Sequence, residues 1–252
     1  MDVMSRPILI VTGGGRGIGA AVAKLAGERG YDVCVSYLKD SSSAEGIAKN
    51  VRACGGRGIA VQGNVASEDD IVRLFETVDA ELGPVAALVN NAAEMGGFGR
   101  LEDVTAETVR TVMGINVIAP FLCAREAVRR MSTEKGGGGG AIVNISSTGA
   151  ERGSPNDWVH YAASKGALNT FTKGLALEVV KEGIRVNAVA PGLTDTENHA
   201  MYGQPDRVVE WQSRLPWGRV AEPREIANAV LWLLSDEASY VTGSIYTVAA
   251  GA

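Results

Sequence analysis

A glycine-rich run between an apolar segment and a helix-forming segment constrains the fold of this chain more than any other feature. Residues 12–19 read TGGGRGIG, directly after the apolar run Ile8–Val11. Glycines let the backbone turn sharply and approach a pyrophosphate, and the N–H groups and dipole at the start of a helix attract anions. A glycine pattern alone is compatible with a merely flexible turn, but this context favours a dinucleotide-binding loop. Its predicted binding residues are Gly13, Gly15, Arg16, Gly17, Ile18 and Gly19.

Short apolar runs and helical periodicities alternate along the chain. Seven runs have the length and composition of strands buried on both faces. They are Ile8–Val11, Val33–Val35, Ile59–Val61, Ala87–Val89, Ile142–Ile145, Val186–Val189 and Ile245–Val248. Segments with apolar residues every three or four positions predict helices at Gly17–Arg29, Ala44–Ala53, Glu68–Leu82, Ala106–Met131, Trp158–Lys181 and Pro223–Leu234. This order predicts a Rossmann-like, doubly wound α/β fold, a seven-stranded parallel sheet with helices on both faces and a ligand crevice beyond the carboxyl ends of the strands.

Composition narrows the class of protein. With 252 residues, 46% of them hydrophobic, the chain is long enough for one substantial core, and we expect a single domain over residues 1–252. A formal charge of −5 gives no basic field for nucleic acid. The run Ile8–Val11 is too short to cross a bilayer and follows no basic leader, so we expect a cytoplasmic protein with no membrane partner.

The cysteines indicate neither a disulfide framework nor a metal site. Cys34, Cys54 and Cys123 are odd in number, widely spaced and set in apolar or helix-like contexts. They predict three buried thiols, and no metal is expected.

Two segments interrupt the alternation of strands and helices. Gly136–Gly140 carries no side-chain chemistry and predicts a flexible surface connector. The long segment from Leu193 to Trp217 combines polar and aromatic residues, a mixture suited to a lid over a partly apolar substrate. Its candidate residues are Thr194, Thr196, His199, Met201, Tyr202, Trp211 and Trp217.

The end of the second strand predicts which dinucleotide is bound. An acidic residue there would bind the adenosine ribose hydroxyls and repel a 2′-phosphate, whereas this chain has Ser36 followed by Tyr37. Arg16 and Lys39 supply positive charge nearby, so NADP(H) is preferred over NAD(H). Asp40 is the counter-argument, because a shifted strand end would bring its carboxylate to the ribose; its position one turn too late speaks against this.

A tyrosine and a lysine four residues apart carry the chemical prediction. Tyr161 and Lys165 share one face of a predicted helix, and a phenol becomes a useful acid or base when nearby positive charge favours its phenolate. Ser147, at the carboxyl end of the fifth strand, would hold a substrate oxygen against the phenol. Taken singly, these residues have ordinary alternatives as a packed aromatic, a solvated charge and a turn cap. Their conjunction with the glycine loop favours catalysis.

Together and in order, these residues resemble the classical short-chain dehydrogenase/reductase family over nearly the whole chain. The matching motifs are the TGGGRGIG loop, Asn90-Asn91-Ala92-Ala93, Asn116, Ser147, the YAASK stretch, and Pro191-Gly192 with Thr196. The resemblance implies that Tyr161 is the general acid/base, that Lys165 binds the nicotinamide ribose and lowers the tyrosine pKa, and that Ser147 polarises the substrate oxygen. Asn116 would anchor a water in a proton relay.

The same resemblance implies further cofactor contacts. Asn90 would steady the sheet and line the cofactor cleft together with Ala92, and Asn64 with Val65 would lie near the adenine. Further contacts would come from Pro191, Gly192, Thr194 and Thr196, the two threonines reaching the carboxamide and pyrophosphate. Asn64 replaces the usual aspartate, Ala93 the usual glycine, and Val248-Ala249-Ala250-Gly251 the usual Val-Asp-Gly-Gly near subunit contacts. A homotetramer is still expected.

The sequence therefore predicts hydride transfer between a nicotinamide and a carbonyl or alcohol carbon of a small ketone, sugar or polyol, with reduction by NADPH favoured. Alternatives are a catalytically idle NADP(H)-binding regulator and, less suited to this chain length, sugar epimerisation or dehydration. His160 is expected on a helix surface, and His199 either contacts substrate or is solvated. Five residues flank the cleft without a ranking: Glu94, Phe98, Glu151, Arg152 and Trp158.

Overall fold

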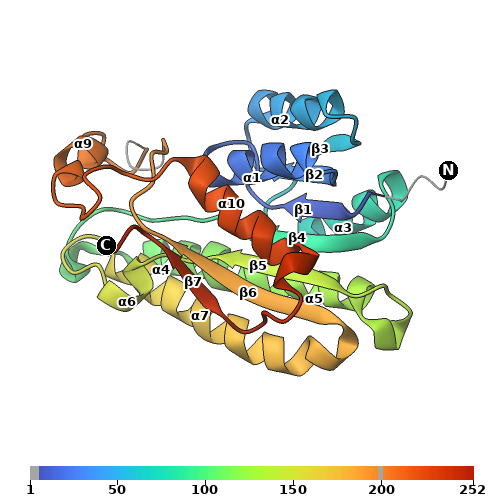
Figure 1. Ribbon diagram of the computed structural model, residues 1–252. Helices are drawn as coiled ribbons and strands as arrows, with labels where there is room; N and C mark the ends of the chain where they lie inside the picture. Colours follow the sequence, from blue (N-terminus) through green and yellow to red (C-terminus); the bar gives the residue numbers. More distant parts are fainter. Residues whose placement is uncertain (1–5, 198–200) are drawn as a thin grey trace.

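A seven-stranded parallel sheet forms the centre of the computed structural model, which describes residues 6–197 and 201–252 (Figure 1). The strand order is β3-β2-β1-β4-β5-β6-β7, and every neighbouring pair is parallel. The strands are β1 (Ile8–Val11), β2 (Asp32–Tyr37), β3 (Gly58–Gln62), β4 (Val85–Asn90), β5 (Gly140–Ile145), β6 (Ile184–Pro191) and β7 (Ile245–Val248). The predicted fold is confirmed, and the seven expected runs lie inside these strands.

Helices cover both faces of the sheet. The α-helices are α1 (Gly17–Glu28), α2 (Ser41–Ala53), α3 (Glu68–Glu81), α4 (Ala106–Met113), α5 (Ala119–Met131), α6 (Gly149–Arg152), α7 (Val159–Val179), α9 (Arg207–Gln212) and α10 (Pro223–Leu234). Helices α1, α2 and α10 pack on one face and α3, α5 and α7 on the other (Figure 1). Short 3-10 turns η1 (Leu101–Asp103), η3 (Thr133–Lys135), η4 (Val180–Glu182) and η5 (Asp236–Ala238) join these elements.

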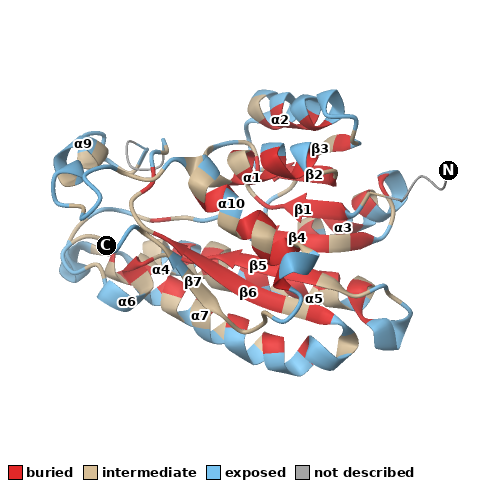
Figure 2. Cartoon of the chain, viewed as in Figure 1, coloured by how far each residue is buried: buried red, intermediate tan, exposed pale blue. Residues whose placement is uncertain are grey.

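Alternation along each strand creates two cores. In β1, Leu9 and Val11 pack with α1 and α10, whereas Ile8 and Ile10 pack with α3 and α5. All four side chains are at most 4% exposed, because a parallel strand covered on both faces buries successive residues on opposite sides. The central strands are accordingly buried along nearly their whole length (Figure 2).

The chain reverses its direction of winding between β1 and β4. Strand β1 pairs with β2 on one side and with β4 on the other, so the loops after β1 and β4 diverge to opposite faces. This divergence opens a crevice at the carboxyl edge of a parallel sheet. The fold thereby places the glycine loop directly beside the Asn90–Ala93 segment.

The long predicted helix at 106–131 is interrupted. A π-helical turn, η2 (Gly114–Ile118), separates α4 from α5, and such turns often occur at functional sites. By length and composition alone this helix is apolar enough to span a membrane. Its residues Cys123, Ala127 and Met131 instead pack into the core beneath β4 and β5.

Two sequence predictions about small residues need correction. Gly136–Gly140 is not a flexible connector: Gly139 N–H donates to the Met131 carbonyl at 2.8 Å, and a Cβ on Gly139 would lie 2.6 Å from the Gly183 carbonyl oxygen. The glycines permit close backbone approach at the start of β5.

Cys34 and Cys123 are buried as predicted, but Cys54, at the C-terminal end of α2, is exposed.

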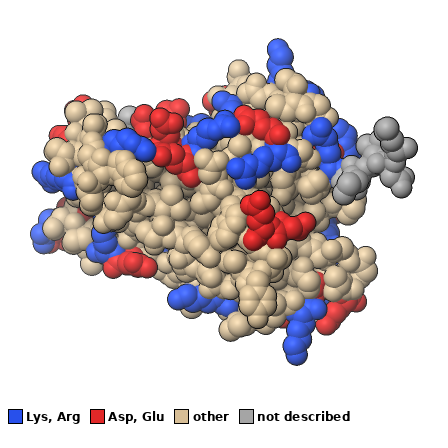
Figure 3. Space-filling view, viewed as in Figure 1, with Lys and Arg blue, Asp and Glu red and all other residues tan. Residues whose placement is uncertain are grey.

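The surface carries both signs of charge. On the face shown in Figure 3, lysine and arginine side chains are interspersed with aspartate and glutamate. This mixture agrees with the formal charge of −5.

Candidate active site

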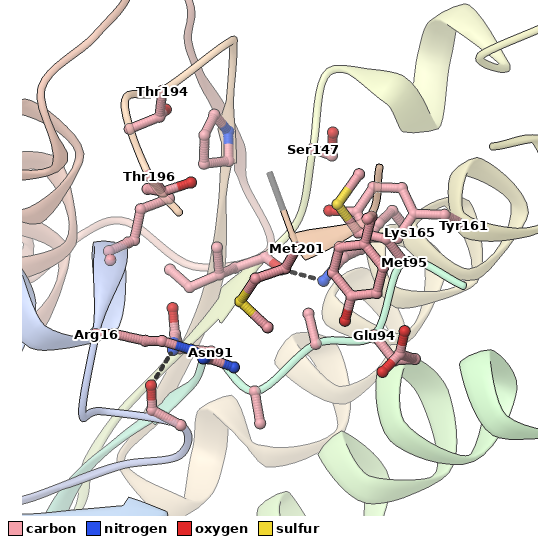
Figure 4. Close-up of a pocket in the computed structure, with 18 of the residues that line it drawn as sticks. Arg16, Asn91, Glu94, Met95, Ser147, Tyr161, Lys165, Thr194, Thr196 and Met201 are labelled. Atoms are coloured by element: carbon pink, nitrogen blue, oxygen red, sulfur yellow. Dashed lines mark hydrogen bonds between the residues drawn. The ribbon is translucent and has the colours of Figure 1, made fainter. Parts of the chain in front are cut away.

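A cavity of about 590 Å³ lies at the carboxyl edge of the sheet. Residues at or just beyond the ends of six strands line it: Gly13 after β1, Ser36 in β2, Gly63 after β3, Asn91 after β4, Ser147 after β5 and Pro191 in β6. Arg16 lies at one end of the cavity and Glu94 and Tyr161 near the other, with Met201 between them (Figure 4). The expected crevice therefore exists, and the strand ends form its floor.

Close backbone packing fixes the loop after β1. Gly13 has φ +62°, and a Cβ there would lie 3.0 Å from the Cα of Ala92. A Cβ on Gly19 would collide with the Asn91 side-chain amide and lie 2.6 Å from the Gly13 carbonyl oxygen. The Asn91 amide donates to the carbonyls of Thr12 and Gly13, and the Thr12 hydroxyl accepts the backbone N–H groups of Asn91 and Ala92. The glycines thus bring two loops and a helix start together.

The start of α1 faces the cavity. Gly15, Arg16, Gly17 and Ile18 line it, and the helix has no side-chain cap. Unpaired N–H groups at a helix start attract phosphate. The predicted anion-binding loop therefore has the geometry that its role requires.

Two basic side chains lie at the far end of the cavity, beyond β2. Ser36 is 2% exposed and lines the cavity with Tyr37, Arg16 and Lys39. Among the described residues, neither Arg16 nor Lys39 has a carboxylate within 4.0 Å. A group with several negative charges fits such a position.

Asp40 also lines this end, but its carboxylate is engaged locally. As the N-cap of α2, it accepts the Ser43 backbone N–H at 3.0 Å and the Ser43 hydroxyl at 2.6 Å. These bonds hold the pKa of Asp40 below its usual value, and the charge of Arg16 acts in the same direction. Both carboxylate oxygens therefore serve the helix start.

The loop after β3 also contributes to the cavity wall. Asn64 and Val65 line the cavity. The Asn64 side-chain oxygen accepts the Ala66 N–H at 3.0 Å, and the Asn64 backbone N–H donates to Asp70 at 2.8 Å. The loop is thus tied to the start of α3.

The three predicted catalytic side chains lie together in one wall of the cavity (Figure 4). Lys165 is 2% exposed, its Nζ donates to the Ile145 carbonyl at 2.8 Å, and it lies 5.5 Å from the Tyr161 ring centroid. The Ser147 hydroxyl lies in the same wall and accepts the Gly149 N–H at 3.0 Å. Helix α7 and the end of β5 thereby bring the three groups together.

Burial dominates the protonation of this group. It raises the pKa of Tyr161 to about 12, with the Ser147 hydroxyl acting in the opposite direction. It lowers the pKa of Lys165 to about 7, because the interior disfavours the ammonium. The sequence analysis expected the lysine to lower the tyrosine pKa; in the protein chain alone, desolvation outweighs any such effect.

Two asparagines expected at the cleft act behind it. The Asn116 amide donates to the Glu94 carbonyl at 2.7 Å and to the Ser164 hydroxyl at 2.9 Å, and its oxygen accepts the Glu94 N–H. Asn116 is fully buried and does not line the cavity, and Asn90 does not line it either. Asn90 bonds Asn144 instead, and the neighbouring Asn91 takes the cavity position. Their functional roles remain predictions.

The segment after β6 covers the cavity from the side opposite the tyrosine. Pro191, Gly192, Thr194 and Thr196 all line the cavity. The Thr194 hydroxyl donates to the Gly192 carbonyl at 3.0 Å, and the Thr196 Cγ2 lies 3.3 Å from where a Cβ on Gly17 would stand. Thr196 therefore lies close to the glycine loop, as its predicted cofactor contact requires.

An aromatic cluster forms the outer wall. The Arg207 guanidinium lies 4.8 Å from the Trp158 ring centroid and 4.7 Å from that of Trp211, and it pairs with Asp157 at 2.7 Å. Trp158, Arg207 and Trp211 line the cavity. The sequence analysis missed Arg207, because no local pattern signals an ion pair between residues 50 positions apart.

Glu94, one of the flanking residues, and His160 make specific contacts. Glu94 accepts the Gly96 N–H at 2.9 Å, and the pKa of the Tyr202 phenol is raised by burial and then by the Glu94 charge. His160 is 5% exposed, and its Nε2 lies 2.9 Å from the Met95 carbonyl oxygen. The predicted surface position of His160 was wrong, because the residue holds the 94–96 loop against α7. His199 lies outside the described residues.

The comparisons with known proteins cover nearly the whole chain. A family model described as "Enoyl-(Acyl carrier protein) reductase" matches residues 13–252. The Escherichia coli protein named "Uncharacterized oxidoreductase YgfF" is 46% identical over 244 residues, 97% of this chain and 99% of that protein. A "Cis-4-hydroxycyclohexanecarboxylate dehydrogenase" of Sinomonas cyclohexanicum is 36% identical over 251 residues, 99% and 98% of the two chains.

A further relative and two solved structures extend the likeness. "Glucose 1-dehydrogenase 2" of Bacillus subtilis is 34% identical over 242 residues, 96% of this chain and 93% of that protein. A mutant of Serratia marcescens short-chain dehydrogenase/reductase superposes with a TM-score of 0.89 at 31% identity over 97% of both chains. A dehydrogenase/reductase from Sinorhizobium meliloti has the same TM-score at 33% identity, over 98% of this chain and 95% of that one.

Proposed function

This chain belongs to the short-chain dehydrogenase/reductase family, and from that premise we propose that it is an NADP(H)-preferring enzyme that moves a hydride between the nicotinamide and a carbonyl or alcohol carbon. The relatives show that the chain is an oxidoreductase of this family. One observation carries the proposal: Ser147, Tyr161 and Lys165 lie in the wall of a cavity whose other end contains the glycine loop. The arrangement supports a proton donor and a dinucleotide site within one cavity.

The side chains of this protein supply the proton chemistry. A nicotinamide dinucleotide, when bound, supplies or accepts the hydride. With a pKa of about 12, Tyr161 is protonated at neutral pH and suited to donate its phenolic proton to a substrate oxygen. Ser147 holds that oxygen against the phenol, and Lys165 fixes the helix face on which Tyr161 lies through its bond to the Ile145 carbonyl. A protonated resting phenol favours carbonyl reduction over alcohol oxidation.

The nucleotide end supports NADP(H) over NAD(H). Ser36 leaves room beside the ribose, and Arg16 and Lys39 have no carboxylate partner among the described residues to compete with a 2′-phosphate. The Asp40 carboxylate, the feature that favours NAD(H), is bonded twice by Ser43. Asn64, Val65 and Ala92 would then line the adenosine and nicotinamide positions, and Thr194 and Thr196 the pyrophosphate side.

The relatives suggest the substrate type. Their names specify a ring alcohol that carries a carboxylate and a sugar. We infer a small ketone or its alcohol, of ring, sugar or polyol type. The protein is further proposed to be a single domain over residues 1–252, cytoplasmic and homotetrameric.

The direct test is NADPH consumption with a panel of carbonyl compounds. The panel contains cyclohexanone, 4-oxocyclohexanecarboxylate, diacetyl and a quinone, and NADH is tested in parallel. We expect turnover of at least one ketone with NADPH preferred. The Tyr161→Phe variant is expected to lose about 100- to 10,000-fold in kcat while binding NADPH normally. Tight cofactor binding without turnover across the panel would point instead to a cofactor-binding regulator.

A further inference from the structure

Three arginines line the cavity, and each has different partners. Arg207 is neutralised by Asp157 at 2.7 Å and lies between two indole rings. Arg16 lies at the nucleotide end, beside the helix start that would hold phosphate. Arg152 lies at the substrate end, and among residues 6–197 and 201–252 no carboxylate oxygen comes within 4.0 Å of it. Arg152 is thus an exposed cation of the substrate half that has no carboxylate partner within the described chain.

Helix α6 holds this cation near the reactive hydroxyls. The helix follows Ser147 directly, and the Arg152 backbone N–H donates to the Thr148 carbonyl at 3.2 Å. The guanidinium donates to the Thr148 hydroxyl at 2.7 Å, and Thr148 is only 6% exposed. One donor of the guanidinium is thus used to fix its direction. Its remaining donors are available to a ligand that is already held by Ser147 and Tyr161.

The surrounding wall is mostly apolar. Trp158, Trp211, Met95 and Met201 line the same part of the cavity. Glu94 also lines the cavity, and its carboxylate already accepts the Gly96 N–H. A ligand that fits these surfaces has an apolar carbon skeleton and an anionic group directed at the free cation.

We propose that Arg152 binds a carboxylate of the substrate, so that the preferred substrates are keto acids, or the corresponding hydroxy acids, with an apolar skeleton between the two functional groups. The inference rests on the proposed function and narrows its substrate class. A guanidinium binds a carboxylate through two parallel N–H donors, and such charge-assisted bonds are stronger than bonds between neutral groups. Arg152 acts on specificity and takes no part in the proton transfer.

The kinetic test compares keto acids with their uncharged methyl esters. Levulinate and 4-oxocyclohexanecarboxylate are each assayed against their methyl esters. We expect the wild-type kcat/KM to be about 10- to 100-fold higher for each acid, the range of a charged hydrogen bond. In Arg152→Gln we expect the ratio of the kcat/KM values for acid and ester to fall to about one. The value for the acid decreases, whereas the value for the ester keeps its wild-type level. Arg152→Lys, which keeps the charge but not the paired donors, is expected to lie between.

A matched control separates local binding from general charge. Arg214 lies 5.2 Å from the Trp211 ring, is not among the cavity-lining residues and has no ion pair within the described chain, so Arg214→Gln removes the same charge nearby. It should leave the preference for acids intact. Equal loss for acids and esters in Arg152→Gln would mean that Arg152 is merely structural, and esters accepted as well as acids by the wild-type enzyme would overturn the inference while leaving the proposed function standing.

A binding measurement keeps the test independent of turnover. Cyclohexanecarboxylate and cyclohexanecarboxamide are titrated calorimetrically into protein loaded with whichever of NADP+ and NAD+ binds more tightly. The acid should bind at least tenfold more tightly than the amide, and this difference should disappear in Arg152→Gln but persist in Arg214→Gln. If no carbonyl compound is reduced, the proposed function fails and this titration still decides the role of Arg152; equal affinities for acid and amide overturn it.

Discussion

The glycine loop at one end of the cavity presents mostly backbone, whereas the substrate end presents long side chains. Gly13 and Gly19 stand where a single added carbon would meet Ala92 or Asn91. The opposite end is built from Arg152, Trp158 and Arg207, which come from three separate segments. A surface formed by backbone atoms has almost no room for an added side-chain atom. A surface formed by side chains can be changed by one substitution at a time. The first end should therefore respond to mutation by losing binding, and the second by changing preference.

The largest expected effect breaks the backbone end. In Gly19→Ala, the new methyl group collides with the Asn91 amide and the Gly13 carbonyl. We expect NADPH affinity to fall by about 4 kcal/mol, roughly a thousandfold, because neither neighbour has room to move. Cofactor fluorescence titration measures this loss. Gly46→Ala is the matched control: nothing lies within 4 Å of its added Cβ on α2, and it should leave binding unchanged.

The pH dependence of the unfolding free energy tests the burial of Lys165. Burial lowers the pKa of Lys165 from 10.5 to about 7, so the unfolded chain binds more protons than the folded chain between these values. The contribution of Lys165 to the free energy of unfolding should therefore rise with pH across this window, by about 3 kcal/mol from pH 7 to 9.5. The buried thiols of Cys34 and Cys123, whose pKa values are raised by burial, oppose this rise from about pH 8.5 upward, and Tyr161 does so above about pH 10.

Urea denaturation of the cofactor-free protein at several pH values checks this slope. In Lys165→Met this contribution is absent, so the stability of the variant relative to the wild type should fall from pH 7 to pH 9.5. A difference between the two proteins that is level from pH 7 to 9.5 would show that the lysine stays protonated in the folded protein.

Substitution of Ser36 tests the preference for NADPH over NADH. Ser36→Asp places a carboxylate at the end of β2, where it would repel a 2′-phosphate and bind ribose hydroxyls. We expect kcat/KM for NADPH to fall about 10- to 100-fold and the value for NADH to rise. The comparison variant Ser36→Asn has a similar size without the charge and should change the ratio of the two values much less. If the ratio of the kcat/KM values for NADPH and NADH is unchanged in Ser36→Asp, the 2′-position of the adenosine ribose does not lie beside residue 36.

The smallest effect concerns the aromatic wall. Asp157→Asn removes the charge that pairs with Arg207, and both side chains are partly buried. We expect a loss of about 1 kcal/mol in unfolding free energy, together with a severalfold rise in KM for the carbonyl substrate and little change in KM for NADPH. Thermal melting and steady-state kinetics measure these changes. An equal rise in both KM values would contradict the division of the cavity into two ends.

The local sequence anticipated the nucleotide end better than the substrate end. The glycine loop and Ser36 could be assigned because their function depends on residues adjacent in the chain and on the known end of a strand. Arg207 could not, since its position depends on Asp157 across a folded loop. The choice between Asn90 and Asn91 was equally hidden, because it depends on which face of β4 turns toward the crevice.

By itself, the sequence determined the alternation of strands and helices, the glycine loop after β1 and the one-turn spacing of Tyr161 and Lys165, because each is a property of contiguous residues. Only the tertiary structure decided that Asn116 and His160 brace the site from behind and that Arg152 faces the cavity without a carboxylate partner in the described chain. Burial and pairing depend on what distant segments bring to the same place, and it is burial that fixes the protonation of Tyr161 and Lys165.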